Sequence, residues 1–137
     1  SGGGNVSAIG STGYCMGGRT SFLANLTQPI QASVSYYGSG IAPSHAARFP
    51  TLIGRAAELH APALFFWGGL DKHILPDQTR AVEDGMRAAG KKFTQVIISD
   101  ADHGFSCDDR SAYNANATRQ AWVLTIEFLA TYLQQKS

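Results

Sequence analysis

Short apolar runs alternate with stretches of helical periodicity along the 137-residue chain. The apolar runs predict four strands, at residues 6–9, 32–37, 63–67 and 93–98. The helical spacing predicts helices at residues 19–26, 49–59, 76–89 and 115–133, the last with Trp122, Ile126, Leu129 and Leu133 near one face. Because strands that alternate with helices are joined by crossovers, this order predicts an α/β fold with three layers around a mostly parallel sheet.

The composition, with 44% apolar and 15% charged residues, is typical of a single globular domain over residues 1–137. The net charge of +1 and one adjacent basic pair, Lys91-Lys92, give no support for nucleic acid or an acidic membrane surface as a partner. No apolar run approaches the ~18 residues of a membrane span, and no signal-peptide pattern opens the chain. Two cysteines 92 positions apart form no disulfide framework, so we expect a cytoplasmic protein.

Residues 13–18 read Gly-Tyr-Cys-Met-Gly-Gly and lie between an expected strand and an expected helix. A nucleophile on so sharp a turn needs small residues two positions before and after it, and Gly13 and Gly17 meet that need. The helix N-terminus would present unpaired N–H groups and about half of a positive charge, which favours a Cys15 thiolate. The alternative interpretation is a small buried cysteine at a tight turn.

Two later loops carry the other parts of a nucleophile, acid and base relay. Residues 68–76 read Gly-Gly-Leu-Asp-Lys-His-Ile-Leu-Pro after the third strand, and residues 101–105 read Ala-Asp-His-Gly-Phe after the fourth. Ligands of open parallel sheets bind at the carboxyl ends of the strands, where these loops meet. We predict that His103 takes the thiol proton, that Asp71 orients its imidazole, and that the N–H of Met16 faces the oxyanion.

Each of these assignments has an alternative. Asp71 could cap the helix after Pro76 or close the glycine turn, and His103 could be a loop histidine with a purely structural bond. His73 is a rival base, but a base from the same loop as the acid would invert the usual geometry. Asp100 and Asp102 are rival orienting groups, although neighbours in one loop seldom reach the Nδ1 atom of a histidine. No spacing of His, Cys and Asp resembles a zinc motif, so we expect no metal.

Four segments resemble the dienelactone hydrolase family of α/β-hydrolases. They are Gly-Tyr-Cys-Met-Gly-Gly-Arg at 13–19, Tyr-Tyr-Gly-Ser-Gly-Ile at 36–41, Gly-Gly-Leu-Asp at 68–71 and Ala-Asp-His-Gly-Phe at 101–105. The similarity spans essentially the whole chain. It implies an α/β-hydrolase fold and hydrolysis of a small ester or lactone by a Cys15–His103–Asp71 triad without a cofactor.

The expected substrate site contains three aromatic residues, Tyr14, Tyr37 and Phe105, near the predicted mouth. They suggest a small, unsaturated or aromatic acyl group, although they could equally line the core. Family members place an arginine for the substrate carboxylate four residues after the histidine, where this chain has Cys107. Arg110 could substitute for that arginine.

The chain corresponds to the C-terminal half of the family's fold. Members carry a further segment before the elbow, which supplies a second oxyanion N–H, a glutamate beside the thiol and another arginine. Without that segment the elbow strand would be a sheet edge, and such edges recruit partners. We therefore expect a homo-oligomer or a missing N-terminal half. The second hypothesis is a catalytically impaired fragment that acts as a binding or assembly module.

Overall fold

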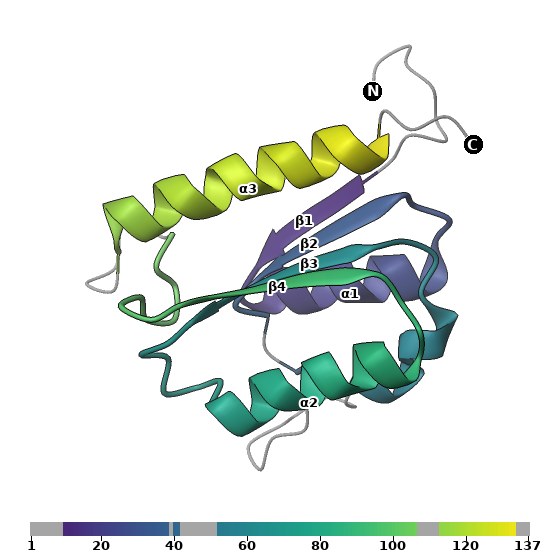
Figure 1. The fold of residues 1–137 in the computed structure, drawn as a ribbon, viewed down its shortest axis with the longest axis horizontal. Helices are drawn as coiled ribbons and strands as arrows, with labels where there is room; N and C mark the ends of the chain where they lie inside the picture. The colour runs from purple at the N-terminus through teal and green to yellow at the C-terminus, as the bar shows by residue number, and fades with distance from the viewer. Residues whose placement is uncertain (1–9, 39, 42–51, 107–112, 134–137) are drawn as a thin grey trace.

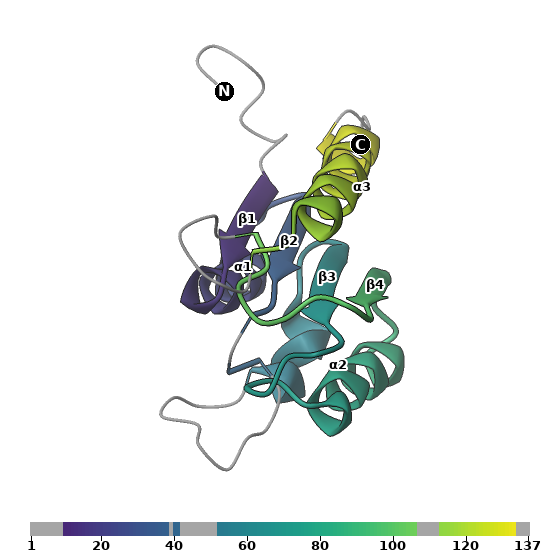
Figure 2. The same cartoon turned by 90° about the vertical axis from the view of Figure 1, so that its left-hand side faces the viewer.

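The computed structural model describes residues 10–38, 40–41, 52–106 and 113–133 (Figure 1). Four parallel strands form one sheet in chain order: β1 (Gly10–Tyr14), β2 (Ala32–Tyr36), β3 (Ala63–Gly68) and β4 (Phe93–Ile98). Two helices, α1 (Met16–Thr27) and α2 (Pro76–Ala88), cover one face, and α3 (Ala115–Leu133) covers the other. This arrangement confirms the predicted α/β fold of three layers, and Figure 2 shows the strands side by side from β1 to β4.

The first strand differs from its prediction. Residues 6–9 lie outside the described residues, and β1 instead occupies Gly10–Tyr14, whose sequence Gly-Ser-Thr-Gly-Tyr has no apolar pattern. It is a strand because it pairs in parallel with β2, from Gly10 opposite Ala32 to Tyr14 opposite Tyr36. Tertiary pairing therefore overrides the weak local preference of this segment. As a consequence, β1 runs directly into Cys15.

The two central strands form the middle of the core. Every residue of β2 and β3 is buried, as the continuous apolar run at 63–67 predicts for a strand covered on both faces. The β3 strand pairs with β2 from Ala63 opposite Ser33, and with β4 from Ala63 opposite Phe93. In contrast, only Ile98 of β4 is buried, and its other residues are partly buried or exposed, because β4 is a sheet edge among the described strands.

The connection between β2 and β3 contains less helix than predicted. The described part of residues 49–59 forms only a 3₁₀ helix, η1 (Ile53–Glu58), and residues 49–51 lie outside the described residues. The prediction for α2 is confirmed to within one residue. Pro76 opens it, the N–H of Leu75 donates to the Gln78 side chain at 2.7 Å, and Gly90 follows it with a φ of 65°.

The closing helix α3 has the predicted bounds but packs through a different face. It buries Ala117, Ala121, Thr125 and Phe128 on the sheet, and the Thr125 hydroxyl lies 2.7 Å from that of Tyr36. The small side chains let the helix approach the strands closely. The predicted apolar face is confirmed in part: Leu129 and Leu133 are partly buried against the core, whereas Trp122 and Ile126 are 52% and 47% exposed. None of the helices in the described ranges is long and apolar enough to cross a bilayer.

Candidate active site

Cys15 stands on a strained turn between β1 and α1. Its φ is 52° and its ψ is −118°, a conformation that L residues rarely adopt. Two sets of backbone bonds hold it there: its N–H donates to the Tyr36 carbonyl at 3.0 Å, and its carbonyl accepts from Gly18 at 2.9 Å. Backbone strain that the surroundings enforce in this way clusters at functional positions. The turn places the thiol at the carboxyl edge of the sheet.

Close contacts with other atoms require glycine at positions 13 and 18 near Cys15, but not at position 17. A Cβ atom at Gly13 would lie 1.8 Å from the Gly17 carbonyl oxygen, and one at Gly18 would lie 2.7 Å from the Cα of Gly38. The sequence-based requirement for Gly13 is therefore confirmed. The requirement for Gly17 is wrong, because a Cβ there would meet no described atom within 4 Å. The contact that excludes a side chain at Gly13 comes from the backbone of residue 17, which any residue at that position would have.

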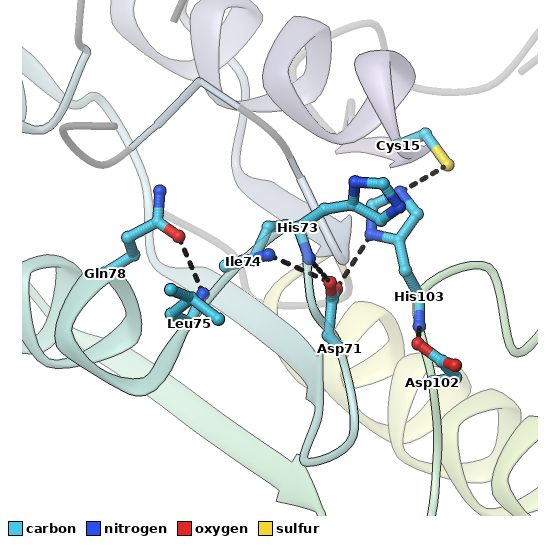
Figure 3. Close-up of polar contacts among 8 residues, drawn as sticks. All are labelled: Cys15, Asp71, His73, Ile74, Leu75, Gln78, Asp102 and His103. Atoms are coloured by element: carbon cyan, nitrogen blue, oxygen red, sulfur yellow. Dashed lines mark hydrogen bonds and ion pairs between the residues drawn. The ribbon is translucent and has the colours of Figure 1, made fainter. Parts of the chain in front are cut away.

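The side chains of Cys15, His103 and Asp71 form a continuous hydrogen-bonded chain (Figure 3). The Sγ atom of Cys15 lies 3.4 Å from Nε2 of His103, and Nδ1 of His103 lies 2.8 Å from Oδ2 of Asp71. With its Nδ1–H donated to Asp71, a neutral imidazole presents the lone pair of Nε2 to the sulfur. The geometry thus allows a proton to pass from the thiol to the imidazole.

Glycines bring the loops of Asp71 and His103 together. The loop that follows β3 bonds to the loop that follows β4 through the N–H of Gly69 to the Ile98 carbonyl at 2.8 Å, and through Leu70 to Ala101 at 2.9 Å. A Cβ atom at Gly68 would lie 2.5 Å from the Ala101 oxygen, and one at Gly69 would lie 2.6 Å from the Cα of Ser99. The two backbones can therefore meet only because residues 68 and 69 have no side chain.

Both oxygens of the Asp71 carboxylate have partners. Oδ1 accepts the N–H groups of His73 at 2.7 Å and Ile74 at 2.9 Å, and Oδ2 binds His103. Burial alone would raise the pKa of Asp71, but the hydrogen bond from His103, the N–H groups of Ile74 and His73, and the imidazole charge hold it below its usual range. The carboxyl is thus ionised at neutral pH and can stabilise an imidazolium. It closes the turn and binds His103 at once, so the two sequence interpretations of Asp71 are compatible.

The rival residues take other positions. Oδ1 of Asp102 accepts the backbone N–H of His103 at 2.6 Å, and the carbonyl of Asp100 accepts the Asn114 side chain at 3.1 Å. The ring of His73 lies edge-on to that of His103, with 5.1 Å between centroids. His73 is therefore next to the site, while the hydrogen bond to Sγ comes from His103. Within the described ranges, no group of three or more His, Cys, Asp or Glu side chains could hold a metal ion.

The predicted oxyanion donor begins α1. Met16 and Gly17 are the first two residues of this helix, and N–H groups in the first turn have no partner within a helix. They follow Cys15 directly, at the positive end of the helix dipole. The backbone thus offers N–H groups next to the thiol, and the oxyanion role of Met16 stays a prediction.

The predicted substrate-binding aromatic residues differ in exposure. Tyr14 is 41% exposed, and its ring lies 4.4 Å from that of Tyr36. Tyr37 and Phe105 are both fully buried, and their rings meet edge to face at 5.1 Å. The core-lining alternative therefore fits Phe105, whereas Tyr14 is accessible to a ligand. Arg110 lies outside the described residues.

Two features of the site are not predicted by the sequence. Tyr37 has a φ of 40°, and its ring lies 5.1 Å from that of His103. The backbone N–H groups of residues 73 and 74 hold the Asp71 carboxylate. A pattern of apolar and polar residues carries no signal for either, although a tyrosine before a glycine at a strand end is a place where unusual backbone angles occur.

The fold and the site define a class of protein. The structure overlays, with a TM-score of 0.76 and 16% identity over 96% of this chain, on 57% of an α/β hydrolase enzyme from a Medee basin deep-sea metagenome library. A family model narrows the class: residues 2–133 match the dienelactone hydrolase family, and the chain belongs to that family.

Relatives with sequence similarity agree with this assignment. A protein of Escherichia coli O157:H7, provisionally named carboxymethylenebutenolidase, is 33% identical over 98% of this chain and 50% of its own length. The structure of a provisionally named dienelactone hydrolase from Klebsiella pneumoniae subsp. pneumoniae MGH 78578 overlays with a TM-score of 0.86 and 28% identity, over 95% of this chain and 55% of that one. The chain thus spans about half the length of the curated relatives that it matches.

Proposed function

We propose that this chain carries the nucleophile, base and acid of a cysteine-dependent hydrolase that cleaves a small ester or lactone. The observation that carries the proposal is the unbroken hydrogen-bonded chain from the Cys15 sulfur through His103 to Asp71. Membership of the dienelactone hydrolase family and the names of the relatives support it.

The proposed reaction has two halves. Nε2 of His103 takes the thiol proton, and the Cys15 sulfur attacks the ester carbonyl to form a tetrahedral oxyanion beside the N–H of Met16. When the carbon–oxygen bond breaks, His103 returns the proton to the leaving alkoxide, which stays tethered if the substrate is a lactone. Water then attacks the thioester with His103 as base, the carbon–sulfur bond breaks, and the carboxylic acid is released.

Two local charges favour the first step. The N-terminus of α1 lies at the sulfur, so its partial positive charge stabilises a thiolate. The ionised Asp71 stabilises the imidazolium that forms when His103 takes the proton. Thiolate and imidazolium therefore both have an opposite charge close by. A free thiol is needed for this chemistry, which supports the cytoplasmic location that we infer.

We further propose that Tyr14 contacts the acyl group, because it directly precedes the nucleophile and is partly exposed. Arg110 stays a proposed substrate contact of the same site. The substrate is a small molecule, and the reaction as written needs neither a metal nor an organic cofactor. The nucleophile and its oxyanion donors do not select the leaving group, so simple esters are suitable probes.

A binding or assembly module is the second candidate function. It is favoured by the free edge of β1, which pairs only with β2 in the part of the chain that the structure describes. Trp122 and Ile126 lie exposed on α3, whose Leu129 and Leu133 side chains lie beside Gly10 of β1. The free edge of β1 and the exposed face of α3 around Trp122 and Ile126 together form one flank of the molecule. We propose that this flank is covered by a second copy of the chain or by further strands of the same fold.

The experiment that tests the enzyme proposal is hydrolysis of p-nitrophenyl acetate by the chain and its Cys15→Ala and Cys15→Ser variants. We expect turnover in the wild type and a fall of about 10³-fold or more in Cys15→Ala, because the nucleophile is lost. The second readout is alkylation of Cys15 by iodoacetamide. Absence of turnover together with alkylation as slow as that of an ordinary thiol would favour the assembly module.

A further inference from the structure

Tyr36 and Tyr37 are consecutive residues whose rings lie in the same cluster. Successive side chains of an extended strand point to opposite faces of a sheet. Here the two rings meet edge to face at 6.2 Å, and both contact Phe105, at 6.2 Å and 5.1 Å. The positive φ of 40° at Tyr37 explains this departure, because it turns the second ring out of the strand's alternation.

The backbone holds Tyr37 in this conformation from both sides. Its N–H donates to the Phe66 carbonyl at 2.7 Å, which continues the ladder of β2 and β3 past the end of β2. The next residue is Gly38, where a Cβ atom would lie 2.4 Å from the Ser35 hydroxyl oxygen. A glycine would adopt the φ of residue 37 without strain, yet the position holds a bulky aromatic residue.

The Tyr37 ring lies against the imidazole that binds Cys15. It is 1% exposed, and its centroid lies 5.1 Å from that of His103, with 56° between the ring planes. The bond from Nδ1 to Asp71 fixes one atom of the imidazole, but the ring could still pivot about that bond. A ring packed against it restricts the pivot, and the 3.4 Å contact between Nε2 and Sγ depends on that angle.

We propose that Tyr37 is a positioning residue, whose strained backbone aims its ring at the His103 imidazole and holds Nε2 toward the Cys15 sulfur. This inference rests on the proposed function, because it assigns Tyr37 a role through His103. It also changes the expected role of Tyr37 from contact with substrate to support of the base. Among the described residues, the titratable groups that contact His103 include those of Cys15, Asp71, His73 and Asp102, besides Tyr37 itself.

The test compares Tyr37→Leu and Tyr37→Phe in the full chain with Tyr36→Leu as the matched control. Tyr36 is a neighbouring buried tyrosine of the same cluster, and no contact of its ring with His103 is seen. We expect kcat for p-nitrophenyl acetate to fall about 10-fold in Tyr37→Leu with little change in KM, because general base catalysis is only partly lost. Tyr37→Phe keeps the ring and should stay within about twofold of wild type.

Alkylation of Cys15 by iodoacetamide across pH supplies the readout that packing alone would not move. A misplaced imidazole no longer supports the thiolate, so we expect the midpoint of the profile in Tyr37→Leu to rise toward about 8.5, the ordinary value of a thiol. Tyr36→Leu should lose thermal stability while its midpoint stays at the wild-type value. Equal profiles in Tyr37→Leu and wild type would overturn the proposal, as would a loss in Tyr37→Phe equal to that in Tyr37→Leu.

A third variant covers the case in which Tyr37→Leu does not fold. Tyr37→Gly removes the ring but accepts a φ of 40° without strain, so it separates the backbone from the side chain. We expect it to show the same raised midpoint, and a wild-type profile in a folded Tyr37→Gly would refute the inference. If the wild type hydrolyses no ester, the proposed function fails on its own, while the alkylation profiles still test the position of the imidazole.

Discussion

Two regions of the molecule differ in how completely their polar groups are hydrogen-bonded and their apolar side chains are covered. One is the carboxyl edge of the sheet, and the other is the flank formed by the outer edge of β1 and the exposed face of α3. At the carboxyl edge, the loops after β3 and β4 bond to each other through their backbones, and each polar atom of the Asp71 side chain has a partner. On the flank, Trp122 and Ile126 are about half exposed, and β1 has one paired side among the described strands.

This difference indicates that the arrangement of the thiol, imidazole and carboxylate and the association of the chain depend on different regions. Cys15, Asp71 and His103 follow β1, β3 and β4, so their relative positions depend on the ladder from β1 to β4. Nothing beyond the outer edge of β1 enters the hydrogen bonds that join them. We therefore expect the thiol and imidazole to be assembled by this chain itself, while the flank governs association.

The largest effect within the paired region is expected from Asp71→Asn. The variant keeps the shape of the side chain but loses the charge that orients and stabilises the His103 imidazolium. We expect kcat for p-nitrophenyl acetate to fall by about 10²–10³-fold with a small change in KM. Steady-state kinetics of the folded variant measure this. A fall below about threefold would show that the negative charge of Asp71 is not needed for the base to act.

The same variant makes a prediction about acid stability. The folded pKa of Asp71 lies below its ordinary value of 3.8, so its stabilising contribution is complete above the unfolded pKa and is lost as the pH falls toward the folded one. The free energy of unfolding should therefore decrease more steeply below about pH 4 in the wild type than in Asp71→Asn. Urea unfolding at a series of pH values measures the two slopes, and parallel slopes would contradict the prediction.

Sequence patterns predict the elements whose burial is decided locally. The apolar run of β3, Pro76 at the start of α2 and the glycine that follows this helix mark the boundaries of these elements correctly. The β1 strand could not be found in this way, because Gly-Ser-Thr-Gly-Tyr becomes a strand only by pairing with β2. The buried face of α3 was missed for a similar reason. Ala117 and Ala121 are buried because a small side chain allows close approach, which a search for large apolar residues overlooks.

Chain order and spacing place Cys15, Asp71 and His103 at the ends of strands, and the structure brings these three side chains together. Their catalytic roles remain predictions. The supports of the site could not be predicted, because they depend on contacts between loops. The bonds from N–H groups to Asp71 and the positive φ of Tyr37 belong to this second group.

A smaller effect is expected from Gly68→Ala, which tests the pairing of the two loops. The new Cβ would lie 2.5 Å from the Ala101 carbonyl oxygen, so the loops of Asp71 and His103 must separate. We expect a loss of about 1–3 kcal/mol in the free energy of unfolding and a fall of about 10-fold in kcat. Gly54→Ala is the matched control, because a Cβ there meets no described atom within 4 Å. Equal stability and kcat in the two variants would show that the loops can rearrange without cost.

The smallest effect on the chemistry, and the sharpest on association, is expected from Ile126→Lys. Residue 126 is about half exposed on α3, so a charge there is tolerated by the monomer but opposes burial against a partner. We expect light scattering after gel filtration to show a wild-type mass above that of a monomer and a lower mass for the variant. Gln120→Lys, at another exposed position of α3, controls for the addition of one positive charge. Alkylation of Cys15 should stay within about twofold of wild type in both, because the hydrogen bond between the thiol and His103 involves neither of these exposed side chains. A monomeric wild type would contradict covering of the flank by a second copy of the chain, and slowed alkylation in Ile126→Lys would show that the two regions are coupled.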